Sequence, residues 1–341
     1  MALLLVPALP AVAFPQASNS GVACQEAARL VERGKQCIAR EQFSEAIEEF
    51  RSALTLCPGR KATTLELAQA YSGARRFPEA ERAAKQFLAG NPRSEEGQFL
   101  LAYSYFMQER FQEAGKTLRR LLDQNDRNAD AHKLMGLTLF FYREYVLAQE
   151  ELLTALRDRP QDQDILYYLG RVYYTQNNFG PAVKVFQRLL ALNPKSYKAH
   201  DNLGLCYDAL GRTEEAIAAF KTAQKLARTA DPAYDWPYAN LAEMLIKQNR
   251  AREALPQARE AVRINPASAR NHFLLGKALA REGEIDLSLE QLQKAAELDP
   301  GLAEVHYLQG QMYQKLGQRD KATREFALFE KISKQTPHKK H

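Results

Sequence analysis

The sequence has few of the residues, and none of the motifs, from which active sites are commonly built. Its 341 residues include four cysteines, six histidines and one tryptophan. There is no glycine-rich phosphate loop, no His-Glu-x-x-His, no Gly-x-Ser-x-Gly and no Cys-x-x-Cys pair. These absences argue against the nucleotide-binding, zinc-peptidase, serine-hydrolase and thiol-redox classes that such motifs mark.

Strong charge and long apolar runs are also lacking. The chain has 47 basic and 41 acidic residues, a net charge of +6 that is mild for this length. Residues 1–20 form an apolar, uncharged stretch that is too short to span a membrane as a helix. The stretch is typical of a secretory signal, with a possible cleavage site at residues 11–13, although it lacks the usual leading basic residue. We expect a periplasmic or secreted protein; a disordered leader on a cytoplasmic protein is the alternative.

What the sequence does contain is a repeat. A proline, or a turn-forming substitute, returns every 34 residues, except for one step of 38 residues between Pro194 and Pro232 that indicates a four-residue insertion. The recurring residues are Pro58, Pro92, Asp126, Pro160, Pro194, Pro232, Pro266 and Pro300. A fixed period of this length predicts a solenoid of stacked repeats.

Each repeat has the pattern of two antiparallel helices. Placing the punctuating residue at position 32 defines nine repeats, which start at residues 27, 61, 95, 129, 163, 197, 235, 269 and 303. Positions 7 and 8 are large apolar then small, as in Leu169 and Gly170, and position 20 is small, as in Ala182. The apolar residues between these points follow helical spacing. Pairs such as Asn193-Pro194 end the second helix, because proline disfavours helical geometry in the residue before it.

This pattern resembles the tetratricopeptide repeat family over residues 27–336. The fifth repeat matches the family signature nearly throughout, with Leu169, Gly170, Tyr173, Ala182, Phe186 and Pro194. The resemblance implies an all-α, right-handed superhelical solenoid of nine helix-turn-helix repeats. We expect one continuous domain over residues 21–336, followed by a basic tail at residues 337–341.

The histidines repeat a single position. His132, His200, His272 and His306 all occupy position 4, where this fold packs a bulky side chain between neighbouring helices. We interpret them as copies of one structural role rather than as metal ligands or acid–base groups. No cofactor and no metal are expected. Because the repeats leave no stretch of chain to build an enzyme domain, we also expect that the protein is not an enzyme.

Two of the four cysteines are candidates for a disulfide. Cys24 lies just before the first predicted helix and Cys57 ends the second, and those two ends are neighbours in an antiparallel hairpin. A bond between them could staple the exposed first repeat. Cys37 and Cys206 fall at inward positions and are expected to act as small buried apolar groups.

The resemblance also implies that positions 2, 5, 9 and 12 of the first helices line a concave groove. These positions, with position 13 at the helix edge, form an aromatic zone in repeats three to five and a cationic zone in repeats seven to nine. The aromatic zone contains Phe99, Tyr103, Phe106, Met107, Leu137, Phe140, Phe141, Tyr167 and Tyr174, interrupted by Lys133 and Arg171. The cationic zone contains Lys247, Arg270, Lys277, Arg281 and Lys315, against Glu243 and Glu304.

Two interpretations of these side chains stay open. The aromatic rings either bind a partner, as a contiguous exposed apolar patch usually does, or pack sideways against adjacent first helices. Trp236, at position 2 of repeat seven, is either a binding hot spot or a seal for the seam opened by the insertion. Asn202 and Asn240 lie at position 6, where some members of the family use asparagine to hold a peptide backbone. Residue 137 is not asparagine, so we do not expect the clamp that grips a C-terminal carboxylate.

These observations favour a non-catalytic scaffold or adaptor that binds a segment of another protein in its groove. If the leader is a signal, we expect a role in envelope assembly or secretion. No small-molecule substrate is expected. One alternative is binding of a polyanion, a nucleic acid or an acidic glycan, through the cationic zone, with nucleic acid the less expected of the two. Another is a regulatory subunit of a separately encoded enzyme.

Overall fold

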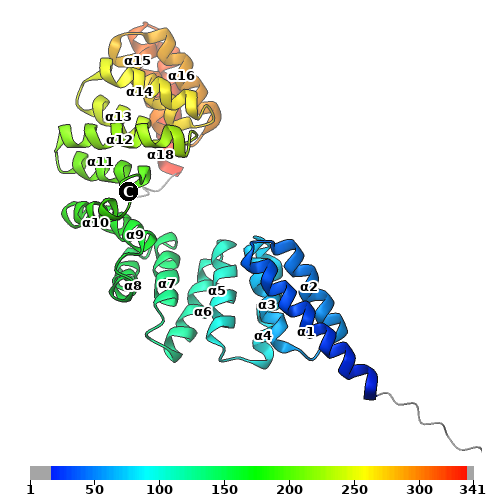
Figure 1. The fold of residues 1–341 in the computed structure, drawn as a ribbon. Coiled ribbons are helices and arrows are strands. Elements are labelled where there is room, and N and C mark those ends of the chain that lie inside the picture. The colour runs from blue at the N-terminus through cyan, green and yellow to red at the C-terminus, as the bar shows by residue number, and fades with distance from the viewer. Residues whose placement is uncertain (1–16, 336–341) are drawn as a thin grey trace, which may run out of the picture. The chain divides into compact units, whose positions relative to one another are not determined.

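The computed structural model describes residues 17–335, which form eighteen α-helices and no strand (Figure 1). The predicted leader lies outside the described residues up to residue 16, and residues 17–20 belong to the first helix. The predicted basic tail at residues 337–341 also lies outside them. The described helices alternate as the first and second members of antiparallel pairs, so the fold is the all-α helix-turn-helix solenoid that the sequence predicts.

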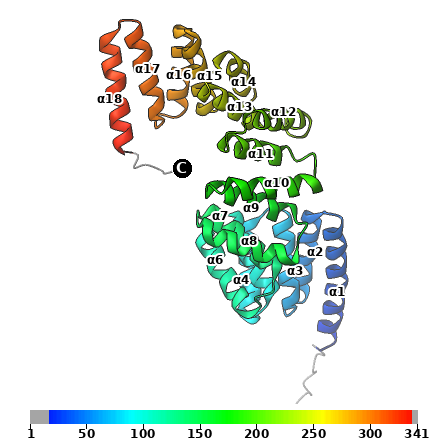
Figure 2. The ribbon, with the colours of Figure 1, turned by 90° about the vertical axis from the view of Figure 1, so that its left-hand side faces the viewer.

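The described residues fall into two compact bodies that divide between Asp158 and Arg159. The N-terminal body contains α1 (Ala17–Ala39), α2 (Phe43–Leu56), α3 (Lys61–Gly73), α4 (Phe77–Gly90), α5 (Glu95–Met107), α6 (Phe111–Gln124), α7 (Ala129–Phe141) and α8 (Tyr145–Asp158). The C-terminal body contains α9 (Gln163–Thr175), α10 (Phe179–Leu192), α11 (Tyr197–Ala209), α12 (Thr213–Ala230), α13 (Trp236–Lys247), α14 (Ala251–Ile264), α15 (Ala269–Glu282), α16 (Ile285–Leu298), α17 (Ala303–Lys315) and α18 (Arg319–Gln335). Within each body, helices adjacent in the sequence pack against one another, as Figure 2 shows from a second side. We expected a single domain over residues 21–336, and each body is described by itself below.

Small residues recur in the repeats because a large side chain of the paired helix occupies their space. Gly170 on α9 faces Phe186 on α10, and a Cβ atom added at Gly170 would lie 2.6 Å from that ring. Gly204 and Phe220 repeat the arrangement in the next pair, at 2.7 Å. Phe186 and Phe220 are fully buried. The paired helices therefore approach closely only where the sequence alternates small and large residues.

The turns inside the helix pairs share one backbone feature. Each pair is joined through a residue with a left-handed backbone, at a φ between 58° and 85°. These residues are Glu41, Arg75, Glu109, Arg143, Asn177, Gly211, Asn249, Gly283 and Gly317. Residues with a Cβ atom are disfavoured in this region, asparagine less than most. The N-terminal body therefore uses four costly charged residues where the C-terminal body uses glycine or asparagine.

The position-4 histidines have the shared structural role that the sequence indicates. The His132 ring contacts the Glu151 carboxylate on the paired helix at 2.5 Å and the carbonyl of Asp126 in the preceding turn at 2.9 Å. His272 repeats both contacts, with the Gln291 amide at 2.9 Å and the carbonyl of Pro266 at 3.0 Å. These rings tie a turn to the following helix pair.

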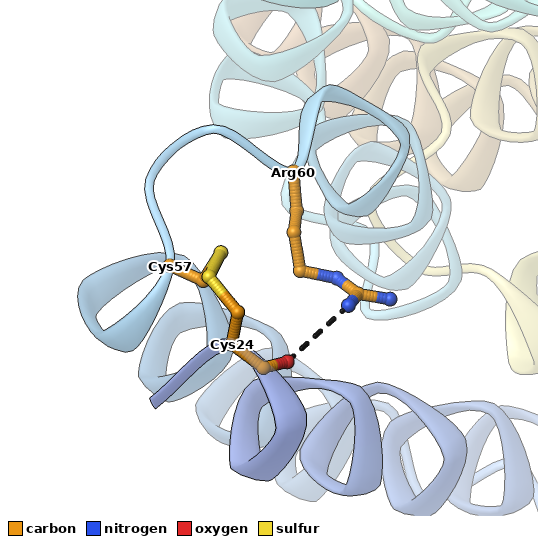
Figure 3. The surroundings of a disulfide bond; sticks show 3 residues. All are labelled: Cys24, Cys57 and Arg60. Carbon is orange, nitrogen blue, oxygen red and sulfur yellow. Dashed lines mark hydrogen bonds between the residues drawn. A yellow bond between two sulfur atoms is a disulfide. The ribbon is translucent and has the colours of Figure 1, made fainter. Parts of the chain in front are cut away.

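A disulfide joins Cys24 and Cys57 in the first helix pair, with 2.05 Å between the sulfur atoms and 5.0 Å between the Cα atoms (Figure 3). The expected position of Cys24 before the first helix was wrong. Because no proline interrupts residues 17–26, α1 begins at Ala17 rather than Ala27, and Cys24 lies within it. Arg60, at the start of α3, donates a long hydrogen bond of 3.5 Å to the carbonyl of Cys24.

The two free cysteines lie in different surroundings. Cys206 is buried, and burial raises the pKa of its thiol to about 12. Cys37 is partly buried and packs against the apolar core of the first repeats.

Candidate functional site

The C-terminal body contains a pocket of about 470 Å³, lined by the first helices of three successive repeats and by the segment before α13. We call it the tyrosine pocket. Its lining residues are Tyr167, Tyr168, Arg171, Tyr174 and Thr175 on α9, Lys198, Asp201, Asn202 and Leu205 on α11, and Tyr234, Trp236 and Asn240 in and before α13. The sequence predicted six of these residues as groove residues: Tyr167, Arg171, Tyr174, Asn202, Trp236 and Asn240. The repeat brings them together because equivalent positions of successive first helices lie on one face.

The floor of the tyrosine pocket is a hydrogen-bonded network centred on Asp201. This carboxylate is only 2 % exposed and accepts hydrogen bonds from the Tyr234 hydroxyl (2.8 Å) and the Asn240 side-chain amide (2.9 Å). Arg270 on α15 donates to the Asn240 amide oxygen (2.9 Å) and to Glu243 (2.7 Å). Burial raises the pKa of Asp201 to about 6, although the hydrogen bonds from Asn240 and Tyr234 act in the opposite direction.

This network corrects the role expected for Asn240. Asn240 was predicted as a groove residue that holds a peptide backbone, but it is 5 % exposed. Both ends of its side-chain amide are already bonded, to Asp201 and to Arg270. Asn240 therefore shapes the pocket floor instead of offering free donors. Asn202 is more open, and one of its amide hydrogens is used by the carbonyl of Lys198 on its own helix (2.8 Å).

Trp236 stands at the rim of the tyrosine pocket and is 52 % exposed. The guanidinium group of Arg270 lies 5.2 Å from the centre of its ring, in cation–π geometry. Tyr238, in the first turn of α13, is buried, and Tyr234, in the turn before α13, is partly buried. The tryptophan ring is left accessible.

The aromatic walls of the pocket come from α9. Tyr167 and Tyr174 are partly buried, and burial raises the pKa of both phenols above the ordinary value. The guanidinium group of Arg171 lies over the rings of Tyr167 (5.7 Å) and Tyr168 (5.8 Å). The walls therefore present uncharged phenols beside a cation, and the one carboxylate of the lining is buried beneath them.

The sequence did not predict the other six lining residues, namely Tyr168, Thr175, Lys198, Asp201, Leu205 and Tyr234. Asp201 occupies position 5 of its repeat, the same position as Phe99, Lys133 and Tyr167, so the register alone could have identified it. The four extra residues extend α12, which has 18 residues where α10 and α14 have 14. Tyr234 follows Pro232 at position 34, where Ser196 caps α11 in the preceding repeat, so the register alone does not indicate its contact with Asp201.

The predicted aromatic residues of the N-terminal body pack against one another and against the core. Phe106, Phe111 and Phe141 form a cluster with ring centres 5.7 to 5.8 Å apart. Phe99, Tyr103 and Phe106 also pack on the buried core between α5, α6 and α7. Here the sideways packing that the sequence left open is what the rings do, with Lys133 and Leu137 half-buried beside them on α7.

Phe140 is the clearest correction among these residues. It was predicted to line the groove, but it is 7 % exposed and belongs to the core. Its ring meets Phe141 edge-on at 5.3 Å and Tyr145 at 5.8 Å. Position 12 faces the neighbouring helices here because the next residue, Phe141, takes the outer position.

The residues of the predicted cationic zone have two different surroundings. Arg270 and Lys247 both pair with Glu243, at 2.7 and 2.9 Å, so one carboxylate offsets one of their two positive charges. Lys277, Arg281 and Lys315 instead line a second pocket, of about 390 Å³, between α15 and α17. Glu304 also lines this pocket.

Neither a metal centre nor a membrane span was found in the part of the chain that the structure describes. In residues 17–335, no three or more His, Cys, Asp or Glu side chains gather where they could hold a metal ion. Over the same residues, no helix combines the length and the apolar character needed to cross a bilayer.

Comparison with known proteins identifies the repeat. The tetratricopeptide repeat model matches residues 65–131, 134–196, 173–234 and 240–303, which together make up more than half of the chain. The small glutamine-rich tetratricopeptide repeat-containing protein 2 of Mycosarcoma maydis is 25% identical over 130 residues, 37% of this chain. The match spans only 35% of that relative's length.

A solved structure shows a similar fold over most of this chain. The Cut9-Hcn1 hetero-tetramer of APC/C contains a chain that is 14% identical and has a TM-score of 0.60, over 83% of this chain and 55% of its own length. MamA from Desulfovibrio magneticus RS-1 is 21% identical, with a TM-score of 0.46, over 52% of this chain and 98% of its own. At these identities the likeness concerns the fold alone. On the strength of the family match and of its helix pairs, the chain belongs to the tetratricopeptide repeat family.

Proposed function

We propose that the protein is a non-catalytic adaptor and that its tyrosine pocket holds an extended segment of a partner protein. The observation that carries this proposal is the convergence of Tyr167, Tyr174 and Trp236 around one open pocket with a polar floor. Pockets that bind ligands combine apolar walls with a few fixed polar groups, and this pocket has both. Membership of the tetratricopeptide repeat family also supports the binding of a partner protein, because repeat solenoids present extended binding surfaces.

The chemistry of the pocket suits an extended backbone with one or two apolar side chains. Tyrosine and tryptophan rings supply contact area at low conformational entropy, and buried aromatic anchors contribute about 1.5 to 3 kcal/mol each. Association opposes this gain by several kcal/mol, so a short peptide alone should bind weakly, in the micromolar range or above. A longer partner that also contacts neighbouring repeats would bind more tightly.

The floor network is the second support for the proposal. Asp201, Tyr234 and Asn240 are bonded to one another before any ligand arrives. A floor that is already ordered does not lose conformational freedom on binding, which lowers the cost of association.

The test compares two alanine substitutions in the pocket with one outside it. Tyr174→Ala and Trp236→Ala remove pocket walls, whereas Tyr142→Ala removes an exposed tyrosine of the N-terminal body. We expect the wild-type chain and Tyr142→Ala to capture the same partner from fractionated cells, identified by mass spectrometry. The two pocket variants should lose that partner while keeping the wild-type circular dichroism spectrum. Undiminished capture by both pocket variants would exclude the tyrosine pocket as the binding site.

We also propose that the protein works outside the cytoplasm, in envelope assembly or secretion. The signal-like composition of residues 1–20 supports this location, and so does the bond between Cys24 and Cys57, because structural disulfides persist mainly in oxidising compartments. Alkylation of thiols in intact, fractionated cells tests it. Protection of two of the four cysteines in the periplasmic or secreted fraction is the expected result, and a fully alkylated cytoplasmic protein would contradict it.

A further inference from the structure

The second pocket of the C-terminal body, between α15 and α17, is distinct from the tyrosine pocket in lining and in charge. It holds about 390 Å³, and we call it the α15–α17 pocket. Three basic side chains line it, namely Lys277 and Arg281 from α15 and Lys315 from α17. The only acidic residue in its lining is Glu304.

The basic residues of this pocket lack the acidic partners that several other basic residues of the C-terminal body have. Arg250 pairs with Glu253 at 2.7 Å and Arg263 with Glu260 at 2.8 Å, each within one helical turn. Within the described residues, by contrast, no carboxylate lies within 4 Å of the charged groups of the three lining residues. The pocket therefore concentrates positive charge that the fold itself does not neutralise.

The contacts that these cations do make hold them in place without cancelling their charge. The Lys277 ammonium lies 5.6 Å from the centre of the Phe273 ring, and Arg281 donates to the amide oxygen of Asn249 at 2.8 Å. A ring face and a neutral amide orient a cation but carry no opposite formal charge. Both groups are thus positioned over the pocket and keep their positive charge.

The rest of the lining is apolar. Phe273, Leu308 and Met312 contribute to it, and Tyr307 is 45 % exposed. The Tyr307 ring is held from behind by Phe326 (5.9 Å) and Phe329 (5.2 Å) on α18. An occupant would therefore meet a fixed apolar wall as well as positive charge.

We propose that the α15–α17 pocket binds an acidic segment of a protein, in which carboxylates flank an apolar side chain. The carboxylates would meet Lys277, Arg281 and Lys315, and the apolar side chain would contact the Tyr307 and Met312 wall. The phosphate or sulfate backbone of a polyanion would leave that apolar wall unused. This inference concerns a site other than the tyrosine pocket, and it holds whether or not the tyrosine pocket binds a partner.

The experiment measures the affinity of the full chain for two fluorescein-labelled peptides by anisotropy at low ionic strength. One peptide repeats Glu-Leu-Glu and the other repeats Gln-Leu-Gln. We expect the acidic peptide to bind at least about tenfold more tightly, a difference of about 1.4 kcal/mol. The preference should shrink as salt is added, because exposed charges are screened. Equal affinities for the two peptides would overturn the proposal.

Charge-neutralising variants locate the site. Lys277→Gln combined with Lys315→Gln should weaken binding of the acidic peptide about tenfold, or about 1.4 kcal/mol. The matched control is Lys221→Gln combined with Lys225→Gln, which removes the same charge from exposed positions on α12 and should have little effect. Equal losses in the two double variants would mean that the peptide senses only net charge, which would contradict the proposal.

A third measurement distinguishes a protein segment from a polyanion as the ligand of this pocket. The affinities of oligothymidylate and heparin are measured for the wild type and for the same variants. If either binds more tightly than the acidic peptide and loses its affinity in Lys277→Gln with Lys315→Gln, the pocket is a polyanion site and our proposal is wrong. Glu304→Gln removes the only acidic lining residue and should strengthen binding of the acidic peptide, whereas weaker binding would contradict the assigned geometry.

Discussion

Both bodies carry aromatic rings on and beside their first helices but use them differently. In the N-terminal body, Phe106, Phe111 and Phe141 pack ring against ring. In the C-terminal body, Tyr167 and Trp236 stand around an open pocket. The difference comes from what occupies the neighbouring repeats, since Asp201 and Asn240 are too short and too polar to fill the space between the rings. In this protein the polar residues between the aromatic rings leave the tyrosine pocket open, whereas the N-terminal rings fill the space between them.

The largest expected effect tests the core assignment of the N-terminal rings. Phe140→Ala should lower the free energy of unfolding of the N-terminal body by about 3 to 5 kcal/mol, because it leaves a cavity in a packed site. Trp236→Ala should leave stability nearly unchanged, since that ring is half exposed. Thermal unfolding followed by circular dichroism measures both. Similar melting for wild type and Phe140→Ala would show that the ring is not core and would break the comparison.

Removal of the disulfide should have the next largest effect on stability, and only on that of the N-terminal body. Replacing both Cys24 and Cys57 by serine should destabilise the N-terminal body by about 3 kcal/mol, because the bond closes a loop over a sequence separation of 33 residues. The control is Cys206→Ala in the C-terminal body, which has no disulfide to lose and gains no buried hydroxyl group. Hydrogen exchange with mass spectrometry resolves the two bodies. Faster exchange confined to the C-terminal body in the serine pair would refute this prediction.

The raised pKa of Asp201 predicts that the stability of the C-terminal body depends on pH. Its folded pKa, about 6, lies above the ordinary value of 3.8, so the folded state binds more protons between these pH values and stability falls as pH rises through them. Relative to Asp201→Asn, the wild type should gain about 1 kcal/mol between pH 7 and pH 5.

Urea unfolding monitored through Trp236, the sole tryptophan, reports this body selectively. Subtracting the free energy of unfolding of Asp201→Asn from that of the wild type at each pH removes the contributions of the other titrating groups. A difference that does not change with pH would show that the carboxylate is not held in the buried network.

The smallest effect concerns the turns. Arg143 has a left-handed backbone, with a φ of 69°, which glycine adopts without steric strain. Arg143→Gly should stabilise the N-terminal body by a few tenths of a kcal/mol to about 1 kcal/mol. The strain energy that it relieves slightly exceeds the free-energy cost of the extra conformational entropy that glycine gives the unfolded chain. Gly211→Ala, at a φ of 72° in the C-terminal body, should destabilise by a comparable amount. Urea denaturation of the pair gives both values, and shifts of the same sign would contradict the assignment.

Much of the fold could be predicted because repetition strengthens weak signals. One pair such as Gly170 and Phe186 says little, but the same spacing over nine repeats predicts paired helices throughout. The candidate site was predicted less completely. The register identified Tyr167, Tyr174 and Trp236, but it also selected Phe140, which is core, and Asn240, which is a floor residue. Register tells which side of a helix a residue occupies, and burial depends on the size of its neighbours in the adjacent repeats.

The sequence alone therefore determined the helix pairs, their period and the side chains that share a face, because these follow from local spacing and from proline. Only the tertiary structure decided that Phe140 is buried while Phe106 and Tyr174 at the same repeat position are not, that Tyr234 donates to Asp201, and that no carboxylate of the described residues lies within 4 Å of the charged groups of Lys277 and Lys315. Each of these facts depends on contacts between residues that no fixed spacing relates, or on the absence of a contact. Such contacts depend on how neighbouring repeats pack, and the sequence of one helix does not determine that packing.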